Sequence, residues 1–238
     1  MESKETAVKI TKKVLGTLTN FLDEEICVVP AEMVSNGVPS KGLVEDRTTV
    51  DAFVNLVNSH KRFVNRSRAE GDPTLVQPIP CAIIRWKDQI LLLRRNKKGH
   101  ALHEKYLLWA GGHVNISDDS PAILATALER ELSEEIFIKG AYRVSDRPVA
   151  LVRTDEDARA SRHIGVLYEI TLTSDDVALA MNQKEFKETR GTSMSGKLVD
   201  PGFLPEIYDK LNDWSKSMVH YFWPELRVGP EHSLFSER

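Results

Sequence analysis

The stretch Gly111-Gly112-His113-Val114, followed along the chain by Arg130-Glu131-Leu132-Ser133-Glu134-Glu135, decides how this sequence is interpreted. Glu131, Glu134 and Glu135 stand at positions i, i+3 and i+4, so on a helix their side chains share one face. Three carboxylates on one rigid element suit a hard divalent cation, above all Mg²⁺. An exposed acidic cluster without a metal is the alternative, because like charges at this spacing cost a helix only about 0.2–0.5 kcal/mol per pair.

The position of Glu135 on the predicted helix favours the first interpretation. The spacing of apolar residues predicts a helix over Pro121–Ile136, with Ser120 as its N-cap. At about 100° per residue, Glu135 projects between Leu124 and Leu128 on the apolar side. A desolvated carboxylate without a partner would cost several kcal/mol there. We therefore expect a positive group to meet Glu135.

The glycine pair is the second half of the pattern. Gly111 and Gly112 follow Trp109 and let the backbone approach a ligand or the packed helix, because no Cβ intervenes. We therefore expect both glycines to contact the substrate. A glycine pair alone is a weak turn signal, and the acidic stretch alone fits any solvated helix. In this order they predict a strand end, a tight loop and a capped helix.

In these residues the sequence resembles the Nudix hydrolase superfamily, whose box reads G-x5-E-x7-R-E-U-x-E-E-x-G-U, with U an aliphatic residue. Gly112 begins the box, and its second half is matched by Arg130, Glu131, Leu132, Glu134, Glu135 and Ile138. Gly112 and Arg130 are 18 positions apart where the pattern has about 14, which indicates an enlarged loop around residues 115–120. Counted forward from Gly112, the first acid of the pattern falls on Asp118; counted back from Arg130, it falls on Ala122. Phe137 replaces the usual glycine.

The resemblance implies a fold and a reaction. The fold is α/β of the α+β type, a mixed sheet between helices, and the order of predicted strands and helices agrees with it. The reaction is hydrolysis, assisted by Mg²⁺ or Mn²⁺, of a nucleoside diphosphate linked to another group. Glu131, Glu134 and Glu135 would hold the cation, which neutralises the diphosphate and holds the attacking water. Arg130 would orient a glutamate, or form an ordinary ion pair with Glu134 at i+4.

Further candidate residues come from their order along the chain. A general base is expected from a box glutamate or from a later loop that carries Glu185 and Glu188, although such acids are more often only solvated. Arg94 and Arg95 end a strand, and alternation sends them to opposite faces, so at most one reaches a phosphate chain; we choose Arg94. His163 opens a predicted strand and either reaches a phosphate or forms only structural hydrogen bonds.

Three other functions fit parts of the pattern. A non-catalytic nucleotide sensor would have the same fold, with the enlarged loop misplacing the water. An isomerase of prenyl diphosphates would need a catalytic cysteine beside the metal, but Cys81 lies in an apolar strand. A structural or partner-binding module would carry the glutamates as surface charge only. The enlarged box, residues 68–70 and 77–80, and residues 213–215 are similar to a Nudix branch described as MutT-type predicted phosphoesterases.

The rest of the chain predicts an extension before the Nudix domain. Amphipathic spacing predicts a helix over 7–22 and a second helix from Thr48 or Thr49 to near Arg66, with an edge strand over 26–34 between them. The turn-rich segment 68–73 marks the join. We therefore expect an extension over 1–73, the Nudix domain over 74–222 and a tail over 223–238. The extension would serve as a lid, a homodimer contact or cover for a sheet edge.

The Nudix domain is expected to contain strands at 79–86 and 90–95, which form a hairpin, and at 149–153 and 163–172. A last helix is expected over Leu204–Val219.

Composition limits the partners. Lys and Arg number 32 against 35 Asp and Glu, so no basic field argues for an anionic membrane or for nucleic acid, except a capped RNA or a nucleotide as substrate. The sequence has no apolar run long enough to span a bilayer and no signal-peptide core, which indicates a cytoplasmic protein. Cys27 and Cys81 lie far apart and are expected to be buried, unreactive thiols.

Overall fold

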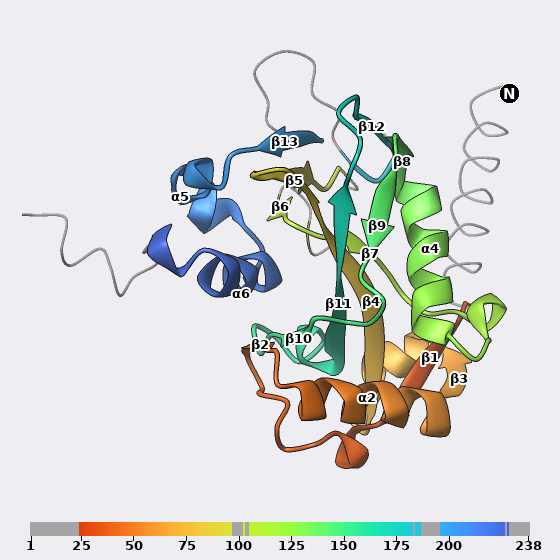
Figure 1. The fold of residues 1–238 in the computed structure, drawn as a ribbon. Coiled ribbons are helices and arrows are strands. Elements are labelled where there is room, and N and C mark those ends of the chain that lie inside the picture. The colour runs from red at the N-terminus through yellow and green to blue at the C-terminus, as the bar shows by residue number, and fades with distance from the viewer. Residues whose placement is uncertain are drawn as a thin grey trace, which may run out of the picture.

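A pair of long parallel strands, β4 (Leu75–Trp86) and β11 (His163–Leu172), forms the centre of the molecule (Figure 1). The structure is a computed structural model that describes residues 24–96, 102, 105–182, 184–186, 196–226 and 228, so the helix predicted over 7–22 lies outside the described residues. The two strands pair from Gln77–His163 to Trp86–Leu172. Both are mostly apolar and buried, as expected for parallel strands covered on both faces.

Antiparallel strands flank this pair and make the sheet mixed. The hairpin of β4 and β5 (Gln89–Arg94) is confirmed, and Lys87 takes a φ of 53° in its turn. The main path of the sheet is β13-β5-β4-β11-β10-β2. The remaining strands on that path are β2 (Gly42–Val44), β10 (Ala150–Arg153) and β13 (Lys197–Val199). Five further strands belong to this sheet outside the main path: β1 (Glu25–Pro30), β3 (Arg62–Asn65), β6 (Tyr106–Leu107), β7 (Ala110–Gly111) and β9 (Tyr142–Val144). A separate two-stranded sheet is formed by β8 (Ile136–Lys139) and β12 (Ala178–Met181).

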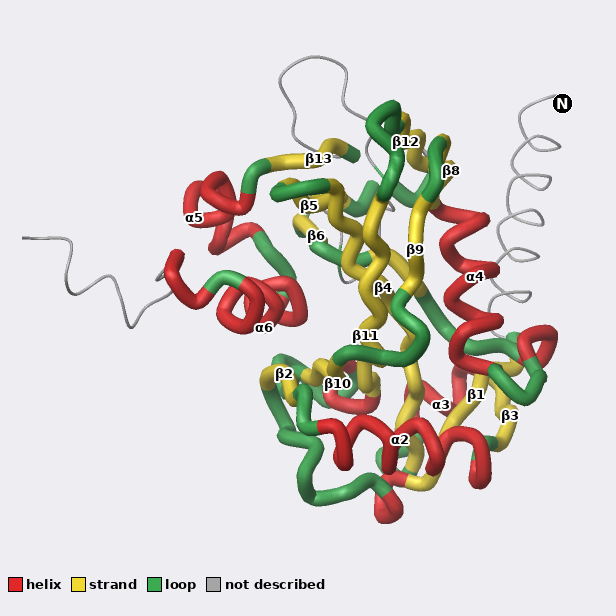
Figure 2. Tube along the Cα trace, viewed as in Figure 1, coloured by secondary structure: helices red, strands yellow, loops and turns green. Residues whose placement is uncertain are grey.

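Helices cover the sheet, which confirms the predicted fold class. Helix α4 (Ile123–Glu135) packs against β4 and β7, and α6 (Asp213–Phe222) packs against β2 and β10 (Figures 1 and 2). Helix α2 (Arg47–His60) contacts β1 and β10. The remaining short helices are α3 (Arg66–Gly71), α5 (Leu204–Ile207) and the 3-10 turns η1 (Ala31–Met33), η2 (Ile116–Asp118), η3 (Ala160–Arg162), η4 (Pro201–Phe203), η5 (Tyr208–Lys210) and η6 (Pro224–Leu226).

The described part of the predicted extension continues the sheet. Strand β1 pairs antiparallel with β4 at Val29–Val76 and Pro30–Leu75, and β2 pairs with β10. Cys27, Val29 and Phe53 belong to the same hydrophobic core as the central strands. Of the three expected roles, cover for a sheet edge is therefore visible in the fold, whereas the boundary at residue 73 stays a prediction.

The first described helix differs from its prediction at both ends. Asp46, not Thr48 or Thr49, is the N-cap of α2, because its carboxylate accepts the Thr49 N–H at 2.8 Å. The helix ends at His60 instead of near Arg66. The residues that follow form β3, which pairs with β1, so tertiary strand pairing overrides the helical pattern.

The later helices also begin elsewhere than predicted. Helix α4 has Ala122 as N-cap, and the Ser120 hydroxyl, our expected cap, lies 2.8 Å from the Thr126 hydroxyl. The predicted continuous helix over 204–219 is wrong. It is broken after η5, where Leu211 is extended and the Asn212 side chain accepts the Ser215 N–H to begin α6.

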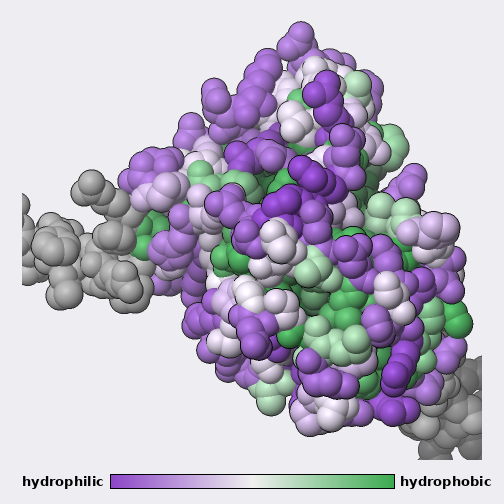
Figure 3. Space-filling view, turned by 60° about the horizontal axis from the view of Figure 1, so that its bottom comes forward, coloured by the Kyte–Doolittle hydropathy of each residue, from purple (hydrophilic) through white to green (hydrophobic). Residues whose placement is uncertain are grey.

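Polar side chains predominate on the face of the molecule in Figure 3, with apolar patches among them. Among the described residues, no helix combines the length and the apolar character that crossing a bilayer requires. Both cysteines are free thiols and buried, as predicted.

Candidate active site

A cavity of about 570 Å³ opens where β7, α4 and the loops before β11 and α6 meet. Its lining includes Gly111, Gly112, Arg130 and the three box glutamates, so the structure brings these predicted site residues together. The charged residues of the lining are eight acids, Glu24, Glu131, Glu134, Glu135, Glu156, Asp157, Glu185 and Asp213, and four arginines, Arg66, Arg95, Arg130 and Arg159. The cavity therefore carries an excess of negative charge.

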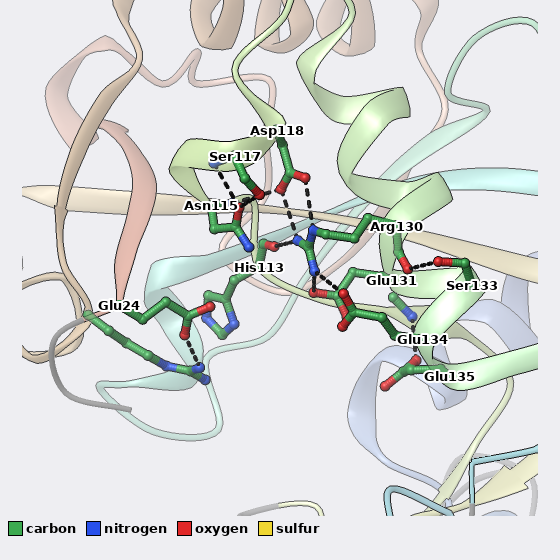
Figure 4. Close-up of polar contacts among 12 residues, drawn as sticks. Glu24, His113, Asn115, Ser117, Asp118, Arg130, Glu131, Ser133, Glu134 and Glu135 are labelled. Atoms are coloured by element: carbon green, nitrogen blue, oxygen red, sulfur yellow. Dashed lines mark hydrogen bonds and ion pairs between the residues drawn. The ribbon is translucent and has the colours of Figure 1, made fainter. Parts of the chain in front are cut away.

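Arg130 of α4 is the hub of the polar network in Figure 4. Its Nε and Nη2 donate to the two carboxylate oxygens of Asp118 at 2.8 and 2.9 Å, and Nη2 also donates to the His113 carbonyl at 2.8 Å. Its Nη1 donates to Glu131 Oε1 at 2.9 Å and lies 3.5 Å from Glu134 Oε1. Arg130 thus orients two glutamates while it forms the i, i+4 pair, so both expected roles are combined.

Asp118 is the residue whose function the sequence left open. It is 2% exposed and forms a bidentate ion pair with Arg130, a geometry that fixes both partners. The enlarged loop presents it through a capping arrangement in which Asn115 Oδ1 accepts the Ser117 N–H and Asp118 Oδ2 accepts the Asn115 N–H. Asp118, which the forward count from Gly112 reaches, is thus the acid that pairs with Arg130, whereas Ala122, which the backward count reaches, is the N-cap of α4.

Glu135 meets the positive group that its position requires. Arg95 Nη1 donates to Glu135 Oε1 at 2.8 Å, and the Gly111 N–H donates to Oε2 at 3.2 Å. Burial raises the pKa of Glu135, and these two donors oppose that shift. The same Arg95 nitrogen lies 3.2 Å from Glu185 Oε2, so one arginine joins the box helix to the loop of the candidate base.

Gly112 makes room for Glu131. A Cβ at Gly112 would lie 2.5 Å from the carboxyl carbon of Glu131, which is closer than real contacts allow. Burial, and then the neighbouring Glu135 carboxylate, raise the pKa of Glu131 to about 7, although Arg130 opposes the shift. Glu134 is different, because 58% of its side chain is exposed. A bound cation would offset the repulsion between these close carboxylates and so lower their raised pKa.

The box carboxylates do not converge on one point. Among the described residues, Glu70, His113 and His163 are the group of three whose ligand atoms all lie within 4.8 Å of one another. Glu131, Glu134 and Glu135 are spread along the cavity wall. One or two carboxylates with water as the remaining ligands is the usual coordination of Mg²⁺ in proteins, so this spread is compatible with such an ion.

The other predicted site residues have separate outcomes. The choice of Arg94 was wrong: it is absent from the lining, and its guanidinium lies 5.4 Å from the centre of the Tyr106 ring. Arg95 lines the cavity instead. Alternation along a strand predicts that the two arginines face opposite sides of the sheet, but not which one faces the cavity. Glu185 lies in the lining, and Glu188 lies outside the described residues. His163 lines the cavity, its Nδ1 donates to the Arg159 carbonyl at 3.0 Å, and burial lowers its pKa.

The extension contributes residues that sequence reasoning missed. Glu24 and Arg66 line the cavity and form an ion pair at 2.9 Å (Figure 4 shows Glu24 beside the site). Glu70 of α3 accepts from Arg159 at 2.8 Å. These contacts join residues far apart along the chain, and the resemblance of residues 68–70 to a Nudix branch gave Glu70 no role at the site.

Comparisons with known proteins agree with this architecture. No family model matches the chain. The crystal structure of Tm1382, named as a candidate Nudix hydrolase, superimposes with a TM-score of 0.63 at 22% identity, covering 85% of this chain and 100% of that one. The chain has the Nudix fold. Protein YmaB of Bacillus subtilis is 28% identical over 207 residues, which cover 83% of this chain and 97% of YmaB.

Both matches bear on the extension of this Nudix fold. Residues 74–238 make up less than 70% of the 238-residue chain, so matches that cover 83% and 85% of it must include part of residues 1–73. Similar proteins therefore share some of the segment that supplies Glu24, Arg66 and Glu70. Assignment to the MutT-type phosphoesterase branch stays a prediction.

Proposed function

We propose that this protein hydrolyses a phosphoanhydride bond in a nucleoside diphosphate linked to another group, with Mg²⁺ or Mn²⁺ as cofactor. The observation that carries the proposal is the set of three box glutamates in one cavity whose acids outnumber its arginines by eight to four. A diphosphate is itself an anion. Its entry into such a cavity requires cations that supply the missing positive charge.

The donor set fits these ions. Glu131, Glu134 and Glu135 offer only oxygen ligands, which Mg²⁺ and Mn²⁺ prefer. When bound, a divalent ion polarises the phosphoryl group and lowers the pKa of a bound water. Arg130, held by the buried Asp118, keeps Glu131 and Glu134 in place. The Gly111 N–H and Arg95 do the same for Glu135.

Glu185 is our proposed general base. Its side chain is 29% exposed and so reaches water in the cavity, while Arg95 at 3.2 Å holds its carboxylate in place. A box glutamate is the second candidate for this role. A fall in kcat without loss of metal affinity in Glu185→Gln would distinguish Glu185 from a metal ligand.

A substrate panel tests the proposal. Nucleotide sugars, dinucleoside polyphosphates, nucleoside triphosphates and capped RNA would be assayed with and without Mg²⁺ or Mn²⁺. We expect metal-dependent turnover of at least one class. Glu134→Gln should lower turnover by about a hundredfold or more, since losing charge stabilisation costs several kcal/mol. The matched control is Glu129→Gln, an exposed acid on the same helix outside the lining.

Two outcomes would reject the hydrolase. Nucleotide binding without any metal-dependent product would favour a non-catalytic sensor on the Nudix fold. Equal behaviour of the Glu134 and Glu129 variants in every assay would favour surface charge without chemistry. The retained Asp118–Arg130 ion pair supports the hydrolase, because the enlarged loop leaves this part of the box assembled.

A further inference from the structure

A second cluster of ligand-type side chains lies beside the box and belongs to three separate segments. Glu70 comes from α3, His113 from the loop after β7, and His163 from the first position of β11. One ligand atom from each lies within 4.8 Å of the other two. The two imidazole ring centres are 5.5 Å apart, and both rings line the cavity.

Hydrogen bonds fix the tautomers of both rings. His163 Nδ1 lies 3.0 Å from the Arg159 carbonyl, which only accepts, so Nδ1 carries the proton. Gln77 donates its amide nitrogen to the Ala69 carbonyl at 3.2 Å, which turns its amide oxygen toward His113 Nε2 at 3.0 Å. His113 Nε2 therefore donates. Each neutral ring keeps one unprotonated nitrogen, and histidines that ligate metals have this same outer arrangement.

The electrostatic setting also permits a cation. Arg159 donates to both carboxylate oxygens of Glu70, at 2.5 and 2.8 Å, Arg66 lies 3.6 Å from Glu70, and Arg66 also pairs with Glu24 at 2.9 Å. The Arg162 guanidinium also donates to the Glu70 carbonyl, so a cation that binds Glu70 has to replace Arg159 at one carboxylate oxygen. The cavity onto which the cluster opens has an excess of acids. An anion would have to compete with the carboxylates that already pair with these arginines.

We propose that Glu70, His113 and His163 form a second metal site, selective for Zn²⁺ or a similar borderline cation. Two imidazole nitrogens and one carboxylate are a ligand set that Zn²⁺ accepts, with the fourth position left to water or substrate. Mg²⁺ prefers oxygen ligands and is expected at the box glutamates instead. Tetrahedral binding would draw the three ligand atoms to about 3.3 Å from one another.

The site would join the extension to the box. Glu70 lies in α3, and His113 follows Gly112 directly, so one ion would fix the glycine loop against the extension and against β11. Because an ion that binds only the folded chain stabilises it, Zn²⁺ should raise the melting temperature of the full-length protein.

The test is a Zn²⁺ titration of the metal-depleted full-length chain in excess Mg²⁺, followed by calorimetry and by melting temperature. We expect one Zn²⁺ per chain, and we expect His163→Gln and Glu70→Gln each to lower its affinity at least tenfold and to abolish the rise in melting temperature. Glu134→Gln, at the box, and His60→Gln, at the end of α2, should bind Zn²⁺ as the parent does.

Co²⁺ bound to the parent chain gives a readout that needs no variant to fold. Intense visible absorption, typical of four-coordinate Co²⁺ with nitrogen and oxygen ligands, supports the site, and weak six-coordinate absorption overturns it. Unchanged Zn²⁺ affinity in both His163→Gln and Glu70→Gln also overturns it, as does loss of Zn²⁺ binding in Glu134→Gln alone. None of these outcomes depends on hydrolysis, so the second site can fail while the proposed reaction stands.

Discussion

The centre of the sheet and the wall of the cavity are buried to a similar degree by different means. In β4 and β11, Ile83 and Leu167 are fully buried and apolar. In the wall, Glu135 is 5% exposed and is held by Arg95, and behind the wall Asp118 is 2% exposed and is held by Arg130, yet both carry carboxylates. The sheet is stabilised by removing apolar surface from water. The wall offsets the desolvation of its charges by ion pairing.

This difference indicates that the sheet contributes mainly to stability and the cavity wall mainly to chemistry. Apolar burial contributes about 25 cal/mol per Å² and needs no defined partner. A buried ion pair is often no more stabilising than apolar residues of the same size, so its presence is weak evidence for a role in stability. We therefore expect substitutions in the sheet to lower stability and substitutions in the wall to lower activity.

The largest change in stability is expected from the sheet. Ile83→Ala should lower the free energy of unfolding by about 2–5 kcal/mol, because it removes buried methyl groups and leaves a cavity. Urea unfolding measures it. Ile116→Ala, at a side chain that is 53% exposed, should change the free energy by about 0.5 kcal/mol at most. Equal losses in the two variants would contradict the assigned core.

A smaller loss is expected from the ion pair of the wall. Asp118→Asn should cost about 2 kcal/mol, less than the ~3–5 kcal/mol of a fully buried pair, because Arg130 is partly exposed and keeps Glu131 and Glu134. Turnover should fall as well. The control is Asp119→Asn, whose side chain is 52% exposed and pairs with Lys61, so it should cost about 1 kcal/mol or less. Loss of stability with full turnover would place Arg130 outside the reaction.

Gly112→Ala should lower activity with little effect on the free energy of unfolding. The added Cβ displaces only the end of the Glu131 side chain, which is flexible, so we expect turnover and Mg²⁺ affinity to fall about 10–100-fold. Kinetics at varied Mg²⁺ concentration measure it. Gly71→Ala is the control, because a Cβ there meets no atom within 4 Å. A stable Gly112 variant with unchanged Mg²⁺ dependence would show that Glu131 is not a ligand.

The smallest effect is expected at the two thiols. Burial raises the pKa of Cys27 to about 12 and also raises the pKa of Cys81 in β4. At pH 8 the reactive thiolate is therefore almost absent in the folded chain. A thiol reagent should label neither cysteine before unfolding and both after it. Rapid labelling of Cys81 in the native protein would show that the sheet centre opens.

The sequence predicted the features that depend on local geometry. Glu131, Glu134 and Glu135 share a helix face because of their spacing alone, and β11 was predicted with its observed bounds because most of its residues are apolar. Helix starts were less predictable, since a side chain that could cap a helix need not do so: Asp46 accepts the Thr49 N–H, whereas α4 begins without a side-chain cap. Asp46 and Ala122 occupy those positions instead of the threonines and Ser120.

Features set by tertiary packing could not be predicted. Alternation separates Arg94 from Arg95 but does not identify the face that meets Glu135. Segment 62–65 has a helical pattern and yet pairs with β1. The association of Glu70 with His163 depends on how α3 and β11 are placed in the fold, for which the sequence contains no spacing rule.

The parallel pairing of β4 with β11 has a consequence for synthesis of the chain. From Gln77 to Trp86, each residue of β4 pairs with a residue 86 positions later in the chain, as Gln77 does with His163. Until residue 172 has left the ribosome, one edge of an apolar strand has no native neighbour, and closing so long a loop is slow. Nascent chains that stop between α4 and β11 should therefore aggregate or recruit chaperones, although they already contain the complete box.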